Sequence, residues 1–588
     1  GNLTSVTNAL GHVTTLSNYD AAGRVGQITD ANGLVTTLTY TARGWLKTRA
    51  VGTLTTTFDY DKVGQLTQVT MPDGSFVVYE YDGAHRLTAI QNQQGERIEY
   101  TLDYAGNRTK EEIKNAQGQV VLRRSSEFNA LNQLVKSLNA ANQVTASFAY
   151  DSNGNMTGVS RFTESETSTS SYSFDPLNRL NKITDALNGI TEFAYDNLDQ
   201  LQSVKDPKGL TTQYSVSALG ELKTTNSPDT ANSTQTFDSA GNVKTSTNAR
   251  GHISTYSYDA LNRITQIQYH DNSSVVFAYD STVNGNFGKG RLTSVTDNSG
   301  STSYQYDNYG RLLTKTQVVD GISLVTAYQY DSVGRLDSVT YPSGRVLGFS
   351  YHQGQLQQLN VDSAARINNI QMQPFAGPTQ WSWGDNSSYS RAFNLDGQLQ
   401  SYTLGNDTVT LNYDRAGRIT AQSHQSQSSR NEQYYYDMLD RITGSSGAFN
   451  LGFNYDANGN RLNQTESSLF SEYSVSQTSN RINNISGALN RSYQYDEAGN
   501  TLSDGERLFS YNSANRLTHI NKGSISQTNL YNGLGQRVRK TVGSNHTLYA
   551  YDEAGHLIGE YHADGSVKME VVYLGDQPVL AMNSSGVF

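Results

Sequence analysis

The hydrophobic positions of this chain are concentrated in short runs rich in Thr, Val and Tyr, and polar turn signals separate the runs. One signal is Asp-x-x-Gly or Asp-x-x-Asn, as at Asp20 to Gly23 and Asp259 to Asn262. A second signal, such as Asp30 to Gly33, follows roughly ten residues later. Runs of this composition between closely spaced turns are typical of β-strands in hairpins. No helical period of any length interrupts the pattern, so it predicts an all-β protein.

The runs form a repeat of about 21 residues that continues through nearly the whole chain. A fixed period of this length indicates an array of one supersecondary unit, and we interpret one repeat as one two-stranded hairpin. The residues that define the repeat are Tyr19, Asp20, Gly23, Arg24, Tyr258, Asp259, Tyr306, Asp307, Gly310, Arg311, Tyr330, Asp331, Gly334, Arg335, Tyr413, Asp414, Gly417, Arg418, Tyr551 and Asp552.

Each part of the repeat has a physical explanation. The Asp carboxylate can accept a backbone N–H two residues further on, and Gly or Asn tolerates the tight exit from the turn. The Arg four residues after the Asp can bridge the turn, and we expect turn chemistry there rather than catalysis because the pair recurs in copy after copy. Aromatic residues two apart, such as Tyr304 and Tyr306, lie on one face of a strand and can form ladders between hairpins.

Two architectures fit a hairpin array. In the first, hairpins add side by side into one long sheet that coils on itself. In the second, pairs of hairpins form four-stranded propeller blades of about 40–45 residues. Blades require inner and outer strands to differ, so alternate repeats should diverge. They do not diverge, and we therefore expect the coiled sheet.

The composition supports a thin wall more than a thick core. Hydrophobic residues make up 36% of the 588, below the ~45–50% typical of globular domains. The chain has 38 Tyr and only 8 Pro, which argues against disorder. The net charge of −10 is spread along the chain without a basic block, so nucleic acid is not expected as a partner. The absence of Cys excludes disulfides, thiolate metal sites and thiol catalysis, and no apolar run approaches the ~20 residues that span a membrane.

At the residues YDxxGRL, repeated with this spacing, the chain resembles the Rhs/YD-repeat family of bacterial proteins. The C components of Tc toxins and the YD shells of animal teneurins are related to this family. The resemblance covers essentially the whole chain. It implies a β-sheet spiral closed into a hollow shell, or cocoon. In Rhs proteins and Tc toxin C components that shell encloses a C-terminal toxin, whereas teneurins use it for cell-surface adhesion.

The resemblance also sets expectations for the organisation of the chain. We expect one repeat array over residues 1–588, with an irregular segment at about 361–400 and a C-terminal stretch, 549–588, that leads toward the family's core end. An N-terminal delivery module, a self-cleavage site and a variable toxin would then lie outside these residues. We accordingly expect no enzyme activity, no metal and no cofactor in this chain.

Several motifs invite a functional interpretation and have a simpler one. The stretch Asp206 to Leu210 reads DPKGL, like the self-cleavage motif DPxGL of the family, but it stands where other copies have their second turn. Asp151 to Asn155 and Asp456 to Asn460 resemble half of a calcium loop, yet lack its Gly at position six and Glu at twelve. We expect all three to be turns. His556 and His562 share one repeat but have no supporting ligands at metal spacing.

Two tryptophans mark the irregular segment. Trp381 and Trp383 are two of only three Trp, and their spacing places them on one strand face. They are candidates for contact with a glycan ligand or with cargo. The alternative is that two large rings fill a bend or seal in the shell.

The leading functional hypothesis is an encapsulating shell of an Rhs-type polymorphic toxin, which sequesters a C-terminal toxic cargo until delivery. Its partners would be that cargo and a secretion or delivery component. Such a bacterial protein would be cytoplasmic before export and then secreted or at the cell surface. The alternative is an extracellular adhesion or carbohydrate-binding surface, and a third hypothesis, a glycan hydrolase, lacks a paired-carboxylate site.

Overall fold

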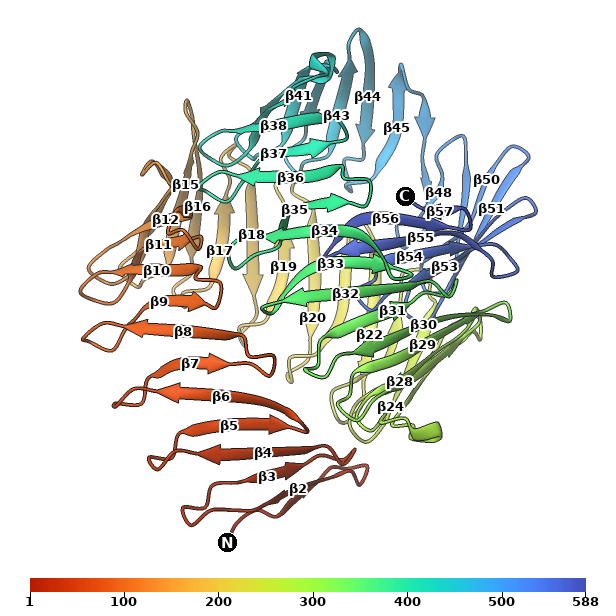
Figure 1. The fold of residues 1–588 in the computed structure, drawn as a ribbon. Helices are drawn as coiled ribbons and strands as arrows, with labels where there is room; N and C mark the ends of the chain where they lie inside the picture. The colour runs from red at the N-terminus through yellow and green to blue at the C-terminus, as the bar shows by residue number, and fades with distance from the viewer. The chain divides into compact units, whose positions relative to one another are not determined.

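The computed structural model describes residues 1–588 and contains 57 β-strands, two short 3-10 turns at Val283–Gly285 and Ser428–Arg430, and no α-helix. Successive strands are joined as antiparallel hairpins (Figure 1). For example, β16 (Thr167–Phe174) pairs with β17 (Leu180–Thr184), which pairs with β18 (Ile190–Tyr195). The prediction of an all-β array of hairpins is therefore confirmed.

The chain divides into two compact units, each assembled from segments far apart in sequence. Unit 1 comprises Gly1–Glu96, Ser254–Ser388 and Ser510–Phe588, and unit 2 comprises Arg97–Ile253 and Tyr389–Phe509. The same hairpin repeat builds both units. Each unit therefore depends on contacts between hairpins that are many repeats apart.

The first turn of the repeat has the geometry that its sequence requires. In the turn between β16 and β17, the N–H of Asp175 donates to the carbonyl of Arg179 at 2.9 Å, and the N–H of Asn178 donates to the carbonyl of Asp175 at 2.9 Å. Asn178 has a φ of 60°, in the left-handed region that favours Gly and Asn. The register shifts by one residue just before the turn, between Ser173 and Phe174. This is a short hairpin loop that ends in a β-bulge, and it explains why the fourth residue is Gly or Asn.

A second set of contacts links each turn to the following repeat. The guanidinium of Arg179 donates to Asp175 Oδ2 at 2.7 Å and lies 4.8 Å from the ring centroid of Tyr195. The hydroxyl of Tyr195 donates to the carbonyl of Leu180, the residue after the Arg, at 2.8 Å. We call this Asp–Arg–Tyr arrangement the inter-repeat lock. It recurs at Arg24 with Tyr40, Arg311 with Tyr330, Arg335 with Tyr351, Arg418 with Tyr436, and Arg441 with Tyr455.

Turn tips also contact turn tips at a nearly constant separation in sequence. In unit 1, Thr53 Oγ1 and Tyr309 Oη are 3.0 Å apart at a separation of 256 residues, and Asn32 Nδ2 donates to the carbonyl of Lys289 at a separation of 257. In unit 2, the N–H of Ala140 donates to a carboxylate oxygen 256 residues further on, at 2.7 Å. Within each unit, the sheet therefore returns on itself after many hairpins instead of closing into four-stranded blades. The coiled sheet is the correct alternative, and the propeller is not.

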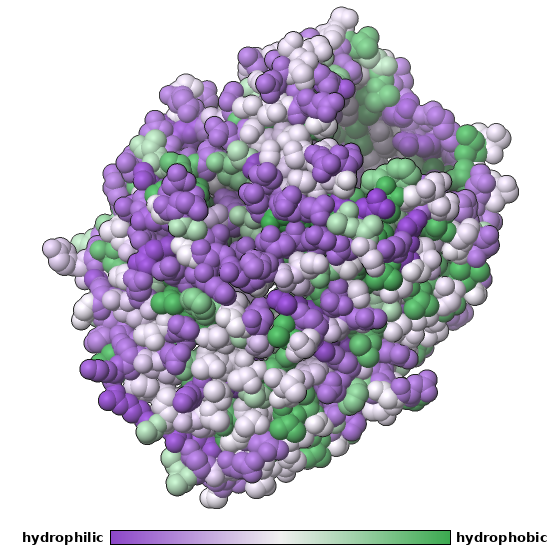
Figure 2. All heavy atoms as spheres, viewed as in Figure 1, coloured by the Kyte–Doolittle hydropathy of each residue, from purple (hydrophilic) through white to green (hydrophobic).

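The sheet is thin, and over most of its length its residues are exposed to solvent. The chain exposes 30225 Å² of surface, whereas a compact protein of its 64.6 kDa would expose about 20,000 Å². Hydrophobic residues on the face shown in Figure 2 are scattered among hydrophilic ones. Of the 30 buried hydrophobic residues, 22 lie between Val295 and Trp381 or between Leu548 and Met582. The substantial core is therefore confined to those two stretches.

We expect the substitution Arg311→Gln to weaken one inter-repeat lock. It removes the ion pair with Asp307 and the stacking on Tyr330, which lies 4.3 Å from the guanidinium carbon. Together these contacts are worth about 1 kcal/mol. Hydrogen exchange should show faster local opening of β29 (Leu312–Val319) and β30 (Ile322–Tyr330). The matched control is Arg124→Gln, whose exposed side chain has only a 3.6 Å ion pair, and equal effects of the two changes would contradict the lock.

The repeated turns also predict cooperative unfolding in acid. Hydrogen bonds from the backbone N–H of Arg86 and then from its guanidinium lower the pKa of Asp82, and the backbone N–H of the corresponding Arg is the main cause of the lowered pKa of Asp20 and Asp175. A depressed carboxyl pKa stabilises the folded state above the unfolded value of about 3.9, and this stabilisation is lost as the pH falls through the folded pKa. Circular dichroism should show unfolding below about pH 4. A transition centred near pH 6 would instead implicate histidines and contradict this explanation.

Candidate functional site at the C-terminal seam

The main two-layer region of the chain lies where its C-terminal strands pack on the middle of unit 1. These strands are β53 (Asn545–Tyr551), β54 (Leu557–Tyr561), β55 (Val567–Leu574) and β56 (Gln577–Asn583). They lie beside β31 (Leu336–Thr340), β32 (Val346–His352), β33 (Gln355–Val361) and β34 (Ala364–Met372) (Figure 1). We call the contact of residues 545–583 with residues 312–383 the C-terminal seam.

A buried carboxylate fastens the centre of the seam. Glu570 on β55 is fully buried, and its Oε1 accepts hydrogen bonds from the N–H of Ser343 and from the hydroxyl of Tyr561, each at 2.9 Å. Its Oε2 accepts the hydroxyl of Ser343 at 2.5 Å. Burial, followed by the nearby Glu570 charge, raises the pKa of Tyr561, so this phenol remains a donor. The three donors compensate for the removal of a carboxylate from water.

A second polar cluster fastens the beginning of the C-terminal segment. Glu553 Oε2 accepts the hydroxyl of Tyr328 at 2.6 Å, and Glu553 Oε1 lies 3.3 Å from the ammonium of Lys315. The buried Lys315 also donates to the carbonyl of Tyr551 at 2.8 Å. Burial, followed by the Glu553 charge, raises the pKa of Tyr328. The cluster therefore ties the turn after β53 to β29 and β30.

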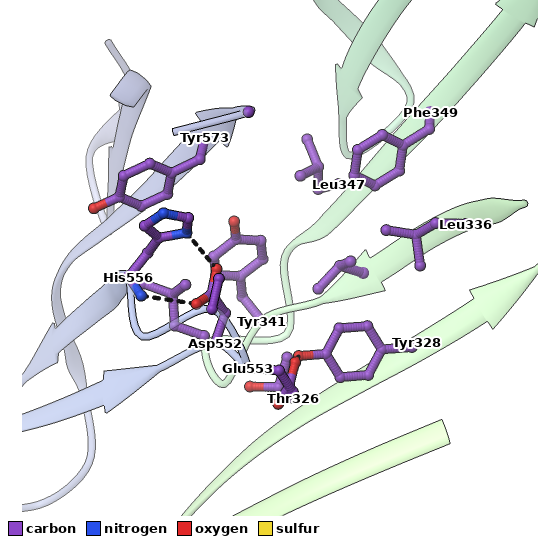
Figure 3. Close-up of a pocket in the computed structure, with 14 residues that line it drawn as sticks. Thr326, Tyr328, Leu336, Tyr341, Leu347, Phe349, Asp552, Glu553, His556 and Tyr573 are labelled. Atoms are coloured by element: carbon purple, nitrogen blue, oxygen red, sulfur yellow. Dashed lines mark hydrogen bonds and ion pairs between the residues drawn. The ribbon is translucent and has the colours of Figure 1, made fainter. Parts of the chain in front are cut away.

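A cavity of about 250 Å³ lies beside this cluster (Figure 3). One wall is apolar and aromatic, and its residues include Leu336, Leu347 and Phe349. The other wall comes from the turn after β53, where Asp552 Oδ2 lies 2.8 Å from His556 Nδ1. The carboxylates that face the cavity are already engaged by His556, Lys315 and Tyr328. The arrangement is therefore suited to holding the C-terminal strands in place.

The predicted repeat residues occupy turn positions. The four predicted glycines have left-handed backbones, with φ of 74° at Gly23, 81° at Gly310, 92° at Gly334 and 89° at Gly417. The predicted Asp residues pair with the Arg four residues later at Asp20, Asp259, Asp307, Asp331 and Asp414. Tyrosine hydroxyls donate to backbone carbonyls of an earlier hairpin at Tyr19, Tyr306, Tyr330, Tyr413 and Tyr551.

The motifs that resembled functional sequences are turns in the structure. In the DPKGL stretch, Asp206 Oδ1 accepts the N–H groups of Lys208 at 3.0 Å and Leu210 at 2.9 Å. In the loop that begins at Asp151, both carboxylate oxygens accept hydrogen bonds from Asn155 at 2.9 Å. The structure contains no group of three or more His, Asp or Glu side chains that could hold a metal. It also has no helix long and apolar enough to cross a membrane.

The two candidate tryptophans belong to the C-terminal seam. They lie on β35 (Pro378–Trp383), with their ring centroids 5.9 Å apart and the rings edge to face. Trp381 is only 3% exposed, so its ring face is not available to a sugar. The indole N–H of Trp383 donates to the carbonyl of Val579 on β56 at 3.0 Å. This placement favours the interpretation that the rings seal a bend.

Sequence reasoning missed the polar groups of the seam. Lys315 and Glu570 are charged residues within β-strands that are otherwise alternating or apolar, which was a signal for buried pairing. The contacts of Glu570 with Ser343 and of Glu553 with Tyr328 carried no signal, because hairpin periodicity does not specify which distant hairpins meet.

Solved structures share this fold at low sequence identity. The crystal structure of TcdB2-TccC3 is 14% identical, with a TM-score of 0.72 over 99% of this chain and 38% of that chain. The complex TcdB2-TccC3-Cdc42 is 13% identical, with a TM-score of 0.73 over 99% of this chain and 40% of that one. The Tc holotoxin pore of Photorhabdus luminescens is 12% identical, with a TM-score of 0.72 over 100% and 39%. This chain thus spans about two fifths of the length of those it matches.

Family models agree with the structural likeness. No curated protein is similar enough in sequence to count as a relative. The RHS repeat model matches residues 288–323. The teneurin YD-shell model matches residues 2–119, 124–288 and 385–585, which is most of the chain. The chain belongs to the teneurin YD-shell family, and the predicted Rhs/YD-repeat resemblance is confirmed.

Proposed function

We propose that the chain forms the wall of an encapsulating shell that encloses a toxic polypeptide attached to its C-terminal side until delivery. The observation that carries this proposal is the thin sheet, which exposes about one and a half times the surface of a compact protein. A sheet exposed to water on both faces cannot form the core of a globular domain. It is suited to form a wall between the outside solvent and an enclosed space. The YD-shell fold supports the same function.

The path of the chain supports closure near the C-terminal seam. Contacts between successive circuits of unit 1 are 256 residues apart at Thr53 and Tyr309. The separation falls to 236 between Asp297 and Gly533, and to 196 between Trp383 and Val579. It is 238 between Arg345 and Asn583, so β56 contacts two different earlier segments of unit 1. These contacts hold the C-terminal strands at the seam, as closure there requires.

The similar structures suggest what the shell contains and meets. One of them is TcdB2-TccC3 solved without its hypervariable C-terminal region, and another is a Tc holotoxin pore. By analogy, the cargo is a variable C-terminal polypeptide, and a separate component delivers it. We propose that any enzymatic activity belongs to that cargo, that the wall itself is not catalytic, and that the protein is bacterial and acts after export. The carbohydrate-binding alternative depended on Trp381 and Trp383, and their packing in the seam removes its support.

Mass spectrometry of the natural full-length protein tests whether the shell encloses a cargo polypeptide. After size exclusion, native spectra should show one particle, and denaturing spectra should release a second polypeptide that stays bound under native conditions. Retention without a covalent bond is expected because the wall surrounds the cargo. A single polypeptide with no retained partner, together with a C-terminal region that protease removes freely from the native particle, would contradict the proposal.

A substitution in the C-terminal seam tests whether closure of the shell at the seam protects the cargo from protease. In the full-length protein, Glu570→Ala leaves the buried Tyr561 hydroxyl without its acceptor, removes both hydrogen bonds to Ser343, and should cost about 2 kcal/mol. We expect the C-terminal polypeptide of this variant to be digested faster, while the milder Glu570→Gln has a smaller effect. Glu472→Ala, at an exposed residue of β44 (Leu469–Val475), is the control and should leave digestion unchanged. Equal digestion of all four proteins would contradict closure at the seam.

A further inference from the structure

The last Tyr-Asp turn of the chain has a histidine at the position that the inter-repeat lock fills with Arg. It reads YDEAGHL, so His556 stands where the locks described above have Arg. A guanidinium stays charged throughout the pH range in which proteins fold, whereas imidazole ordinarily titrates near pH 6.5. The substitution places a group that titrates near neutral pH in the turn that begins the C-terminal seam.

His556 occupies the position of the Arg and makes equivalent contacts. Its Nδ1 lies 2.8 Å from Asp552 Oδ2, as the Arg guanidinium lies against the Asp of its own turn. Its ring stacks on Tyr573 with centroids 4.6 Å apart and planes at 17°. The hydroxyl of Tyr573 donates to the carbonyl of Leu557, the residue after the His, at 3.1 Å. The inter-repeat lock is therefore complete, with imidazole in place of guanidinium.

His556 also has a second carboxylate partner. Its Nε2 lies 3.3 Å from Oδ1 of Asp576, which is in the turn between β55 and β56. Neutral imidazole has a single N–H and can donate to only one of the two carboxylates, whereas imidazolium donates to both. The bridge from the turn before β54 to the turn before β56 therefore requires the proton.

The surroundings of His556 favour its charged form. Asp552 is on its own turn, and Glu553 faces the same cavity (Figure 3). Asp576 approaches from the turn between β55 and β56. Lys315, on β29, is the opposing charge, and it is bound to Glu553. The hydrogen bond to Asp552 raises the pKa of His556 above its ordinary value, and partial burial acts against it.

The other titratable groups packed nearby are phenols of β30, of β55 and of the turn after β31. Burial raises the pKa of Tyr328, Tyr341 and Tyr573, so these side chains stay neutral and do not titrate near neutral pH. His556 is therefore the group whose charge changes in this part of the seam.

We propose that His556 is a proton-operated latch, in which the imidazolium bridges Asp552 and Asp576 and holds together the turns that precede β54 and β56 among the C-terminal strands. Because the folded state favours the protonated form, its stabilisation is complete below about pH 6.5 and is lost as the pH rises through the folded pKa. The latch is thus closed at mildly acidic pH and loosened at alkaline pH. This pH-dependent stabilisation of the C-terminal strands does not require cargo. Only an effect of the latch on cargo rests on the proposed function.

Hydrogen exchange of the full chain at about pH 6 and about pH 8.5, corrected for the intrinsic rate, tests the latch. Protection of residues 557–583 should be lower at the higher pH, by up to about tenfold for each unit by which the pKa of His556 is raised. His556→Arg restores the lock of the other turns and should make protection of this segment independent of pH. Protection around the Arg locks of unit 2 gives an internal reference for both proteins.

The matched control is His562→Gln. His562 is exposed in the next turn of the same hairpin and does not stack on Tyr573, so this variant should keep the wild-type pH dependence. Identical pH profiles for the wild type and His556→Arg, or loss of the pH dependence in His562→Gln, would overturn the proposal. Hydrogen exchange of these residues reports on the wall alone. A result that contradicts the latch would therefore not contradict the proposed encapsulation of cargo.

Discussion

A single-layer sheet cannot rely on a hydrophobic core, and the rest of this structure follows from that constraint. Most strands here are only half-buried, so burial alone does not hold neighbouring hairpins in register. The inter-repeat lock supplies the missing specificity. In each lock an Asp orients an Arg, the Arg stacks on the Tyr of the next repeat, and the Tyr hydroxyl returns to the backbone beside the Arg. One short motif thus shapes a turn and couples it to its neighbour.

The C-terminal seam solves a different problem, because there a second layer must be held against the first. Apolar burial is concentrated in this region, and buried polar groups determine how the layers align. Glu570 accepts donors from Tyr561 on the neighbouring strand and from Ser343 in a distant turn, and the exposed Glu553 joins Tyr328 and the buried Lys315. Removing a partner of the buried Glu570 or the buried Lys315 leaves a charge with fewer partners in a dry environment, so the alignment is stringent. The seam is consequently the place where attachment of the C-terminal strands can be controlled.

Much of the fold could be predicted from the sequence because its determinants are local. The Gly or Asn at the fourth turn position, the Asp–Arg spacing and the period all act within a few residues, and they specify an all-β hairpin array. The contact of Glu570 with Ser343 and the contact of Trp383 with Val579 are different. They depend on how many repeats complete a circuit, and no local pattern encodes that number. The two tryptophans illustrate the difference, since their shared strand face was predictable and their burial against β56 was not.

The central proposal is that the wall surrounds a polypeptide and closes at the C-terminal seam. Cryo-electron microscopy of the natural full-length protein tests this claim most directly. We expect a continuous wall with additional density inside it that is absent from the same protein truncated at Phe588. An empty interior in the full-length particle, with the C-terminal region visible outside the wall, would contradict the account.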